Sequence, residues 1–370
     1  MCDYFRTQTL CQSISLWTQG ERGMESSGPL KKTPRRREHG ASARQRRDRN
    51  VPTEQTRHFQ QAARVDGIRA RTRSAGRLPA GLRDRVARRL AAGQREDGGW
   101  AGRAGGSDLY YTSFALRLAD ALDLEDARLW QGAAGFLRSG VNMAGVADVL
   151  NLIESWEILD RRLSKPAAGG QGVVRVEDAL SPFRRRDGFA LRPGGPLSCY
   201  ATFMAWRACM AAAAPAPWLE EAATAVAATQ RPDGGFAEAE AESSGASSTA
   251  AALCLFCAAG SGHGAERRAA AFLASLRRAD GGFAANALAH NGDLLSTFTA
   301  LVALSFWAES HVARLGDAAR FVRGLSRDGG WLSCASDTGT DVEYAYNGFA
   351  SLCVLASLAE ARTSSRMDCG

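Results

Sequence analysis

The chain has 370 residues, 45% hydrophobic and 23% charged, a profile of globular proteins that argues against a fully disordered or membrane-embedded chain. Its net charge of +7 is concentrated in residues 1–77, which hold 17 Lys and Arg against 7 Asp and Glu, while the rest holds 29 against 32. The remainder is mildly acidic, which excludes a nucleic-acid-binding function for the folded part, and no apolar run reaches the roughly 20 residues of a transmembrane helix.

Residues 1–77 contain few apolar side chains and several basic clusters, such as Arg35–Arg37. This composition predicts a disordered segment, with a basic tail for nucleic acid or membranes as the alternative. The segment lacks the compact apolar core of a secretory signal peptide. The 9 cysteines form no disulfide framework, and Cys254 and Cys257 stand inside an apolar helical run, where packing is expected rather than zinc or redox chemistry. We therefore expect a reducing, cytoplasmic location.

A four-residue motif, Asp-Gly-Gly-aromatic, recurs along the rest of the chain. It stands at residues 97–100, 233–236, 280–283 and 328–331, with a shortened copy at 187–189. The Asp positions are 90, 46, 47 and 48 residues apart, so the first step is about twice the others. Such periods are typical of repeat proteins. The doubled step predicts a degenerate sixth copy near residues 140–145, where Asn142-Met143-Ala144-Gly145 stands.

Each copy follows an amphipathic stretch and precedes a stretch that is apolar nearly all round. A helix with one apolar stripe lies on a surface, and one that is apolar on all sides is buried. We expect outer helices near residues 80–92, 126–138, 173–184, 217–229, 264–277 and 310–325. We expect inner helices near residues 108–121, 146–160, 197–213, 244–258, 293–307 and 341–360. Side chains suited to N-caps stand at their starts: Asp108, Ser198, Ser243 or Ser244, Asp293 and Asp341.

The repeated unit Gln/Arg-x-x-Asp-Gly-Gly-Phe/Trp, clearest at residues 94–100 and 230–236, resembles the prenyltransferase and squalene-cyclase repeat. The resemblance covers nearly all of residues 80–360. It implies an all-α fold, an (α/α)6 toroid of six inner and six outer helices over residues 78–362, with a short tail at 363–370. Periodicity alone leaves an open solenoid as the alternative. The resemblance also implies an isoprenoid or other apolar small molecule in a central apolar cavity.

A single toroid of this length is similar to the β subunit of protein prenyltransferases. That similarity implies an isoprenoid diphosphate substrate, a helical α-type partner subunit and a zinc ion. Aligned on the repeat, the zinc-binding Asp falls on Asp293, but the Cys position falls on Leu295 and the His position on Glu343. The stretch 284–290 has no Arg or Lys to hold the diphosphate.

A replacement metal site for Zn²⁺ or Mg²⁺ is the resulting hypothesis, built from residues at one end of the expected ring: His290, Asp293, Asp341 and Glu343. The alternative is that Asp293 and Asp341 are only N-caps and that the helix dipole favours Glu343 in the first turn.

Aromatic side chains on the inner helices are the candidates for ligand contact, and about half of them are expected to face the centre: Tyr110, Tyr111, Trp156, Tyr200, Phe203, Trp206, Phe298, Tyr344 and Tyr346. Three functions remain open. The first is prenyltransferase-like activity. The second is a non-catalytic toroid that binds a lipid or a protein, which the altered ligand set favours. The third is a terpene cyclase, which would need a carboxylic acid in the cavity, with Asp148 and Glu154 as candidates.

Overall fold

The computed structural model describes residues 74–163, 175–238, 242–260, 264–307 and 315–367. Over these ranges the chain forms twelve α-helices and two short β-hairpins, so the fold is all-α as predicted. The inner helices are α5 (Leu109–Ala121), α7 (Val146–Leu163), α9 (Cys199–Ala211), α11 (Ala246–Ala259), α13 (Leu294–Trp307) and α15 (Val342–Met367). The outer helices are α4 (Ala80–Ala92), α6 (Ala127–Arg138), α8 (Val176–Leu180), α10 (Leu219–Ala227), α12 (Ala265–Ser275) and α14 (Leu315–Gly324).

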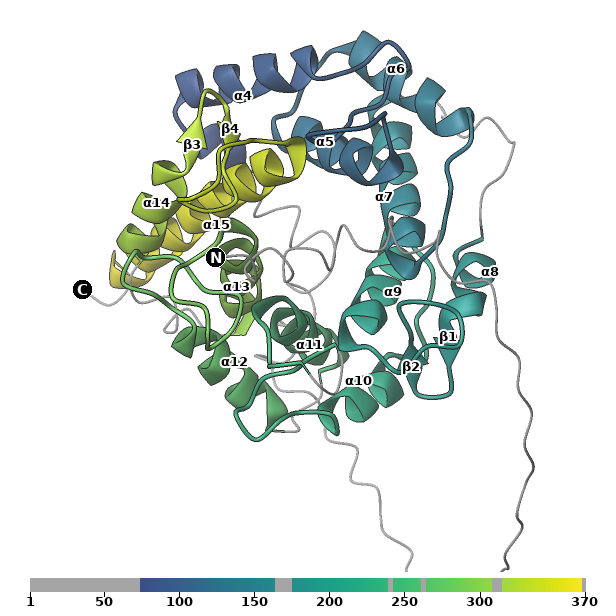
Figure 1. The fold of residues 1–370 in the computed structure, drawn as a ribbon, viewed down its shortest axis with the longest axis vertical. Coiled ribbons are helices and arrows are strands. Elements are labelled where there is room, and N and C mark those ends of the chain that lie inside the picture. The colour runs from purple at the N-terminus through teal and green to yellow at the C-terminus, as the bar shows by residue number, and fades with distance from the viewer. Residues whose placement is uncertain (1–73, 164–174, 239–241, 261–263, 308–314, 368–370) are drawn as a thin grey trace, which may run out of the picture. The chain divides into compact units, whose positions relative to one another are not determined.

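The inner helices form a closed ring. Each packs against the next in chain order, and α15 packs back against α5 (Figure 1). The outer helices lie around this ring, each paired with the inner helix that follows it. The structure thus confirms the toroid that the repeats and their family resemblance predict, and excludes the open solenoid.

The Asp-Gly-Gly motif makes four of the six turns from an outer to an inner helix, and a shortened and a degenerate copy make the other two. In the first copy, Asp97 Oδ1 accepts hydrogen bonds from the Gly99 amide at 2.9 Å and from Ser107 Oγ at 2.8 Å. Gly98 has a φ of +85°, and a Cβ there would lie 2.0 Å from Gly132 O of the next outer helix. Only glycine fits such a contact at a positive φ. The motif therefore sets both the turn and the approach of neighbouring repeats.

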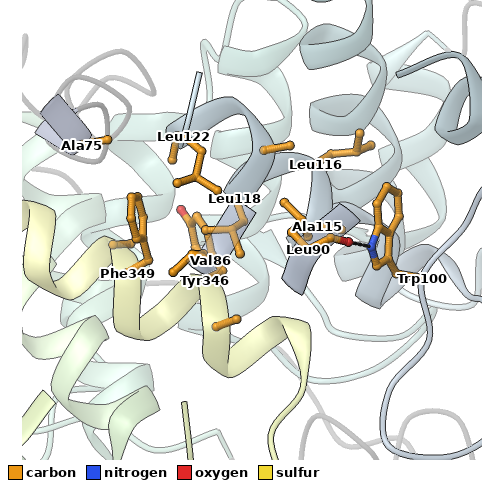
Figure 2. Packing of buried hydrophobic residues seen from close by; sticks show 14 of the residues in the cluster. Ala75, Val86, Leu90, Trp100, Ala115, Leu116, Leu118, Leu122, Tyr346 and Phe349 are labelled. Carbon is orange, nitrogen blue, oxygen red and sulfur yellow. Dashed lines mark hydrogen bonds between the residues drawn. The ribbon is translucent and has the colours of Figure 1, made fainter. Parts of the chain in front are cut away.

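The last copy of the motif closes the ring on the first outer helix. A Cβ on Gly329 would lie 2.7 Å from Arg85 O of α4, the same relation that Gly98 has to α6. Figure 2 shows the apolar side of this seam, where α4, α5 and α15 meet. Val86 of α4 and Phe349 of α15 are fully buried there, and Trp100 Nε1 donates to Leu90 O at 2.9 Å.

The third outer helix departs from the prediction. Helix α8 ends at Leu180 and gives way to a 3-10 turn, Ser181–Phe183, and a hairpin of β1 (Arg184–Arg185) and β2 (Gly188–Phe189). Pro182 accounts for the early end, because proline has no amide hydrogen to continue the helix. A second hairpin, β3 (Ser326–Arg327) and β4 (Gly330–Trp331), carries the last copy of the motif.

The ring extends slightly beyond the expected bounds of 78–362. A 3-10 turn at Ser74–Arg77 belongs to it, since Ala75 is buried and Arg77 pairs with Glu360 at 2.7 Å. Helix α15 continues to Met367. The prediction of disorder for the N-terminal segment lies otherwise outside the described residues.

Candidate functional site

The six inner helices begin in one register. The residues that precede them are Asp108, Gly145, Ser198, Gly245, Asp293 and Asp341. Four of these are side-chain N-caps, as predicted; for example, Asp293 Oδ1 accepts from the Ser296 amide at 2.8 Å. At α11 Gly245 takes the cap position, and Ser244 bonds to Asp233 instead. Residues that share an ordinal position in these helices therefore lie at similar depth in the ring.

The second position forms the outermost level and holds a buried carboxyl group. Glu343 of α15 is 7% exposed, and the Tyr110 hydroxyl of α5 donates to it. Burial raises the pKa of Glu343 to about 7, assisted by the nearby charge of Asp341 and opposed by the Tyr110 hydrogen bond. At neutral pH this carboxyl group is thus close to half protonated. Asp341 itself pairs with Arg103 at 3.0 Å.

An aromatic level lies one turn further in. The ring centroids of Tyr110 and Phe114 are 5.0 Å apart, those of Phe114 and Tyr346 5.6 Å, and those of Tyr346 and Phe298 5.7 Å. These four side chains come from α5, α13 and α15 and form a continuous chain of edge-to-face and tilted contacts. The chain of rings is linked to the outermost level by Tyr110, whose hydroxyl donates to the Glu343 carboxyl group.

A charged level follows at the ninth position of the first three inner helices. Arg117 of α5 and Arg207 of α9 both pair with Glu154 of α7, and Arg117 Nε donates to Glu154 Oε2 at 2.8 Å. Arg117 also donates to Asn151 Oδ1 at 2.8 Å. The expectation of inner helices that are apolar nearly all round is wrong for α5, α7 and α9, because their inward face at this depth is ionic.

Three of the nine predicted aromatic contacts, Tyr110, Phe298 and Tyr346, meet in the aromatic level. Tyr200 and Phe203 lie on the same helical stripe as Arg207 and are partly exposed. Four others have different surroundings. Trp206 is buried in the helix core, Trp156 lies under Arg138 of the outer layer, Tyr111 packs on Gly102, and Tyr344 stacks with Arg103.

The described residues give no support to the metal hypothesis. Over the described ranges, no three His, Cys, Asp or Glu side chains gather closely enough to hold an ion. Asp293 and Asp341 act as N-caps, as the alternative interpretation expects, and Asp341 is also paired with Arg103. His290 is exposed on its loop. Metal binding by these residues stays a prediction.

Both acids proposed for cyclase chemistry are engaged in other contacts. Asp148 accepts hydrogen bonds from the Ala144 and Gly145 amides at 2.8 and 3.0 Å, at the start of α7. Glu154 is held between two arginines. Burial raises the pKa of Glu343, which the sequence placed among metal ligands instead, to about 7.

The buried cysteines are poor nucleophiles. Burial raises the pKa of Cys254 and of Cys353 to about 12, and the pKa of Cys257 well above its ordinary value. Only the thiolate attacks or binds metal well. Cys254 and Cys257 are free thiols, which agrees with the packing role expected of them.

One cavity, of about 330 Å³, lies at the ring seam between α4 and α15. Val86, Leu90 and Trp100 line it from one side, and Val342 and Ala345 from the other. Asp341, at the start of α15, and Leu118 of α5 also line it.

The sequence interpretation missed Phe114, Arg117 and Arg207. A signal for them exists, because all six inner helices can be aligned on the residue before their first turn. That alignment places Arg117, Glu154 and Arg207 at one depth without any coordinates. Among the described residues, no helix combines the length and apolarity needed to cross a bilayer.

Comparison with known proteins agrees with this architecture. Residues 198–368 match the family model described as the prenyltransferase alpha-alpha toroid domain. No curated protein matches the chain. A protein from Actinoplanes has a similar structure, with 18% identity and a TM-score of 0.50 over 76% of this chain and 99% of that one.

The type II terpene cyclase MstE from Scytonema is also similar. A variant of it with geranylgeranyl dihydroxybenzoate bound as substrate gives a TM-score of 0.52 at 12% identity, over 80% of this chain and 99% of that one. Another variant holds the product merosterolic acid A, with a TM-score of 0.51 at 14% identity over the same shares of the two chains. At these identities the likeness establishes the fold.

These comparisons give no support to a helical partner subunit, and the nearer similarity to protein prenyltransferase β subunits stays a prediction. The repeat motif, the closed ring of paired helices and the matched domain agree with one another. Residues 198–368 match the prenyltransferase alpha-alpha toroid domain, and the described residues as a whole form an alpha-alpha toroid.

Proposed function

We propose that this protein binds an isoprenoid inside its inner ring, with the hydrocarbon chain against the aromatic level. The observation that carries the proposal is the continuous contact of Tyr110, Phe114, Tyr346 and Phe298 on the inner faces of three helices. MstE, which shares the fold, holds a geranylgeranyl substrate. An extended polyene matches such a surface because both are apolar and rich in π electrons. The free buried cysteines support a reducing, cytoplasmic setting.

The test is equilibrium binding of geranylgeraniol to the purified full chain. A neutral alcohol is chosen so that the result depends on the hydrocarbon chain and not on a charged head group. Removing the Phe298 ring by Phe298→Ala should weaken binding by about 10- to 100-fold, the worth of one buried aromatic side chain. Tryptophan fluorescence or calorimetry measures the change.

Phe136→Ala is the matched control. Phe136 lies on outer helix α6 and is partly buried like Phe298, but it packs against the Gly98-Gly99 turn rather than the inner ring. The control should lower stability and leave the affinity within about twofold of the wild type. Equal loss of affinity in both variants, or no binding by the wild type, would contradict the proposal.

Proton-initiated cyclisation is a second candidate activity, favoured by Glu343. In this reaction the Glu343 O–H bond breaks, a C–H bond forms on a terminal alkene, and the alkene π pair is consumed to leave a tertiary cation. Further alkene π pairs close the rings, and the final cation loses a proton to the Glu343 carboxylate. The neighbouring aromatic level would stabilise the cations. The raised pKa keeps the proton in place near neutral pH, while a weaker acid also protonates alkenes more slowly.

This candidate is tested by product analysis. Wild-type protein incubated with geranylgeranyl substrates that end in an alcohol, a carboxylate or a diphosphate should give cyclised product with at least one of them. Glu343→Gln should abolish product and retain binding. Binding without any product from the wild type would favour the non-catalytic toroid, and release of diphosphate onto an acceptor would favour prenyl transfer.

A further inference from the structure

The inner ring contains an ion cluster with unequal charges. Arg117 and Arg207 contribute two guanidinium groups, and Glu154 is the only carboxylate that pairs with either of them in the described part of the chain. Their side chains are 11%, 20% and 3% exposed, so the cluster is largely shielded from water. One positive charge is therefore left in excess within the ring. Burying such a charge costs several kcal/mol unless an anion compensates it.

Arg207 is positioned to meet a ligand. Its guanidinium group pairs with Glu154 of α7. Burial is the largest single influence on the pKa of Arg207 and lowers it, but Glu154, Tyr346 and Tyr200 together raise the pKa above its ordinary value, so the side chain stays charged. Its Nε is buried and has no hydrogen-bond partner. A guanidinium group in this state can donate to a further acceptor.

Asn347 is a second polar group without a partner at nearly this depth. Its residue is 1% exposed, and neither its amide nitrogen nor its amide oxygen has a hydrogen-bond partner. It follows Tyr346 of the aromatic level and lies one helical turn inward of Glu343. Buried amides are nearly always bonded, so an orphaned one calls for an explanation.

We propose that Arg117 and Arg207 bind a carboxylate head group on the isoprenoid, whose chain then extends along the aromatic level. The proposal rests on the isoprenoid-binding function above and specifies its substrate class. A carboxylate carries one negative charge, which equals the excess on the cluster. A diphosphate carries about three, which the cluster leaves largely uncompensated. Arginine forms matched pairs of hydrogen bonds with carboxylates, which suits the free Nε of Arg207.

The competing explanation is that the cluster only holds the three helices in register, as buried ion triads do in some proteins. The two explanations differ in what a ligand's head group does. A purely structural cluster is indifferent to whether the ligand ends in a carboxylate or an alcohol.

The experiment compares geranylgeranoic acid with geranylgeraniol, which share one hydrocarbon chain, on the full-length protein at pH 8. The wild type should bind the acid at least about 10-fold more tightly, the lower end for a hydrogen bond to a charged group. Arg207→Met, which keeps the apolar stem, should reduce this preference to about onefold and leave the affinity for the alcohol nearly unchanged. Arg207→Lys keeps the charge and should retain part of the preference.

Arg161→Met is the matched control. Arg161 lies further along α7 and pairs with Asp120 of α5, so its replacement should leave the preference for the acid intact. Equal binding of acid and alcohol by the wild type would overturn the carboxylate assignment while the proposed function stands. Tighter binding of geranylgeranyl diphosphate than of the acid would also overturn it. If neither the acid nor the alcohol binds, the isoprenoid-binding function fails, and this inference fails with it.

Discussion

The two halves of the inner ring, α5 to α9 and α11 to α15, share one frame of helices and turns but carry different side chains at the centre. At the ninth position, α5, α7 and α9 carry Arg117, Glu154 and Arg207, whereas α11, α13 and α15 carry Cys254, Val302 and Ala350. The turns that build the frame are nevertheless alike in both halves. The backbone amides of Trp100 and Phe236 each donate a hydrogen bond at 3.0 Å to a threonine hydroxyl, that of Thr112 and Thr249 respectively.

This difference shows that the repeat specifies the ring and leaves the inward positions free to diverge. The motif residues act on the turn and on the next outer helix, so they make no demand on the ninth position. The family model covers residues 198–368, which leaves α5 and α7 outside the match. Two of the three residues of the charged level, Arg117 and Glu154, therefore lie outside the matched range, and Arg207 lies inside it.

The largest expected effect is a loss of stability when the charged level of the first half is disrupted. Glu154→Leu leaves two buried arginines without a counter-charge, and this should lower the free energy of unfolding by about 3–5 kcal/mol. Arg207→Met should cost much less, because Arg117 and Glu154 remain as a balanced pair. Urea unfolding followed by circular dichroism measures both.

Cys254→Val is the counterpart in the apolar half. It changes a buried side chain of similar size and should cost less than about 1.5 kcal/mol. If Arg207→Met were as costly as Glu154→Leu, the excess positive charge inferred for the cluster would be wrong.

A second prediction concerns how stability depends on pH through the buried carboxyl groups of the half formed by α11, α13 and α15. The pKa of Glu343 is raised from 4.5 to about 7 by burial, so the folded state holds its proton at a pH where the unfolded state has lost it. Stability should fall as the pH rises from about 4.5 to 7, by roughly 3 kcal/mol in total. Glu343→Gln should remove this slope and make the protein more stable at pH 8.

Asp293→Asn provides a control with a different window. Burial raises the pKa of Asp293 from 3.8 to about 6, and asparagine is as good an N-cap as aspartate. This variant should flatten the stability profile between about pH 4 and 6 and leave the higher range to Glu343. A profile that stays steep between pH 6 and 7 in Glu343→Gln would show that another group titrates there.

The seam between the halves gives a third prediction. Gly329 has a φ of +81°, and a Cβ there would lie 2.7 Å from Arg85 O. Gly329→Ala should therefore cost about 2 kcal/mol from backbone strain and displacement of α4. Gly105→Ala is the comparison, since Gly105 also has a positive φ but meets no atom within 4 Å. Equal losses would mean that strain alone, and not the seam contact, sets the cost.

Most of the frame could be predicted from sequence because its determinants are local and repeated. Asp97 binds the amide of Gly99 two residues further on, and the N-caps act on the next turn of their own helices. Even the degenerate turn was placed correctly, since residues 139–145 join α6 to α7. The exception is α8, which ends early because of Pro182. Pro182 is visible in the sequence, but the repeat period by itself predicts a full-length outer helix there.

The site was less predictable because it depends on which helices face one another. Arg117 and Arg207 are 90 positions apart and are linked only through Glu154 on the helix between theirs, so each alone reads as an isolated charge in an apolar helix. Glu343 illustrates the opposite case. Its position was found by alignment, but its raised pKa comes from burial and from the charge of Asp341, against the opposing hydrogen bond from Tyr110. Burial of that kind is a property of the assembled ring.

The smallest expected effect tests whether the frame is equal in the two halves. Thr112→Val and Thr249→Val each remove the hydroxyl that accepts from a buried amide, Trp100 N or Phe236 N. Each loss should cost about 1–2 kcal/mol, the penalty of an unsatisfied buried donor. The two costs should agree within about 0.5 kcal/mol in thermal or urea unfolding. A clear difference would show that the charged level of the first half stabilises its turns, and that the frame and the centre are coupled after all.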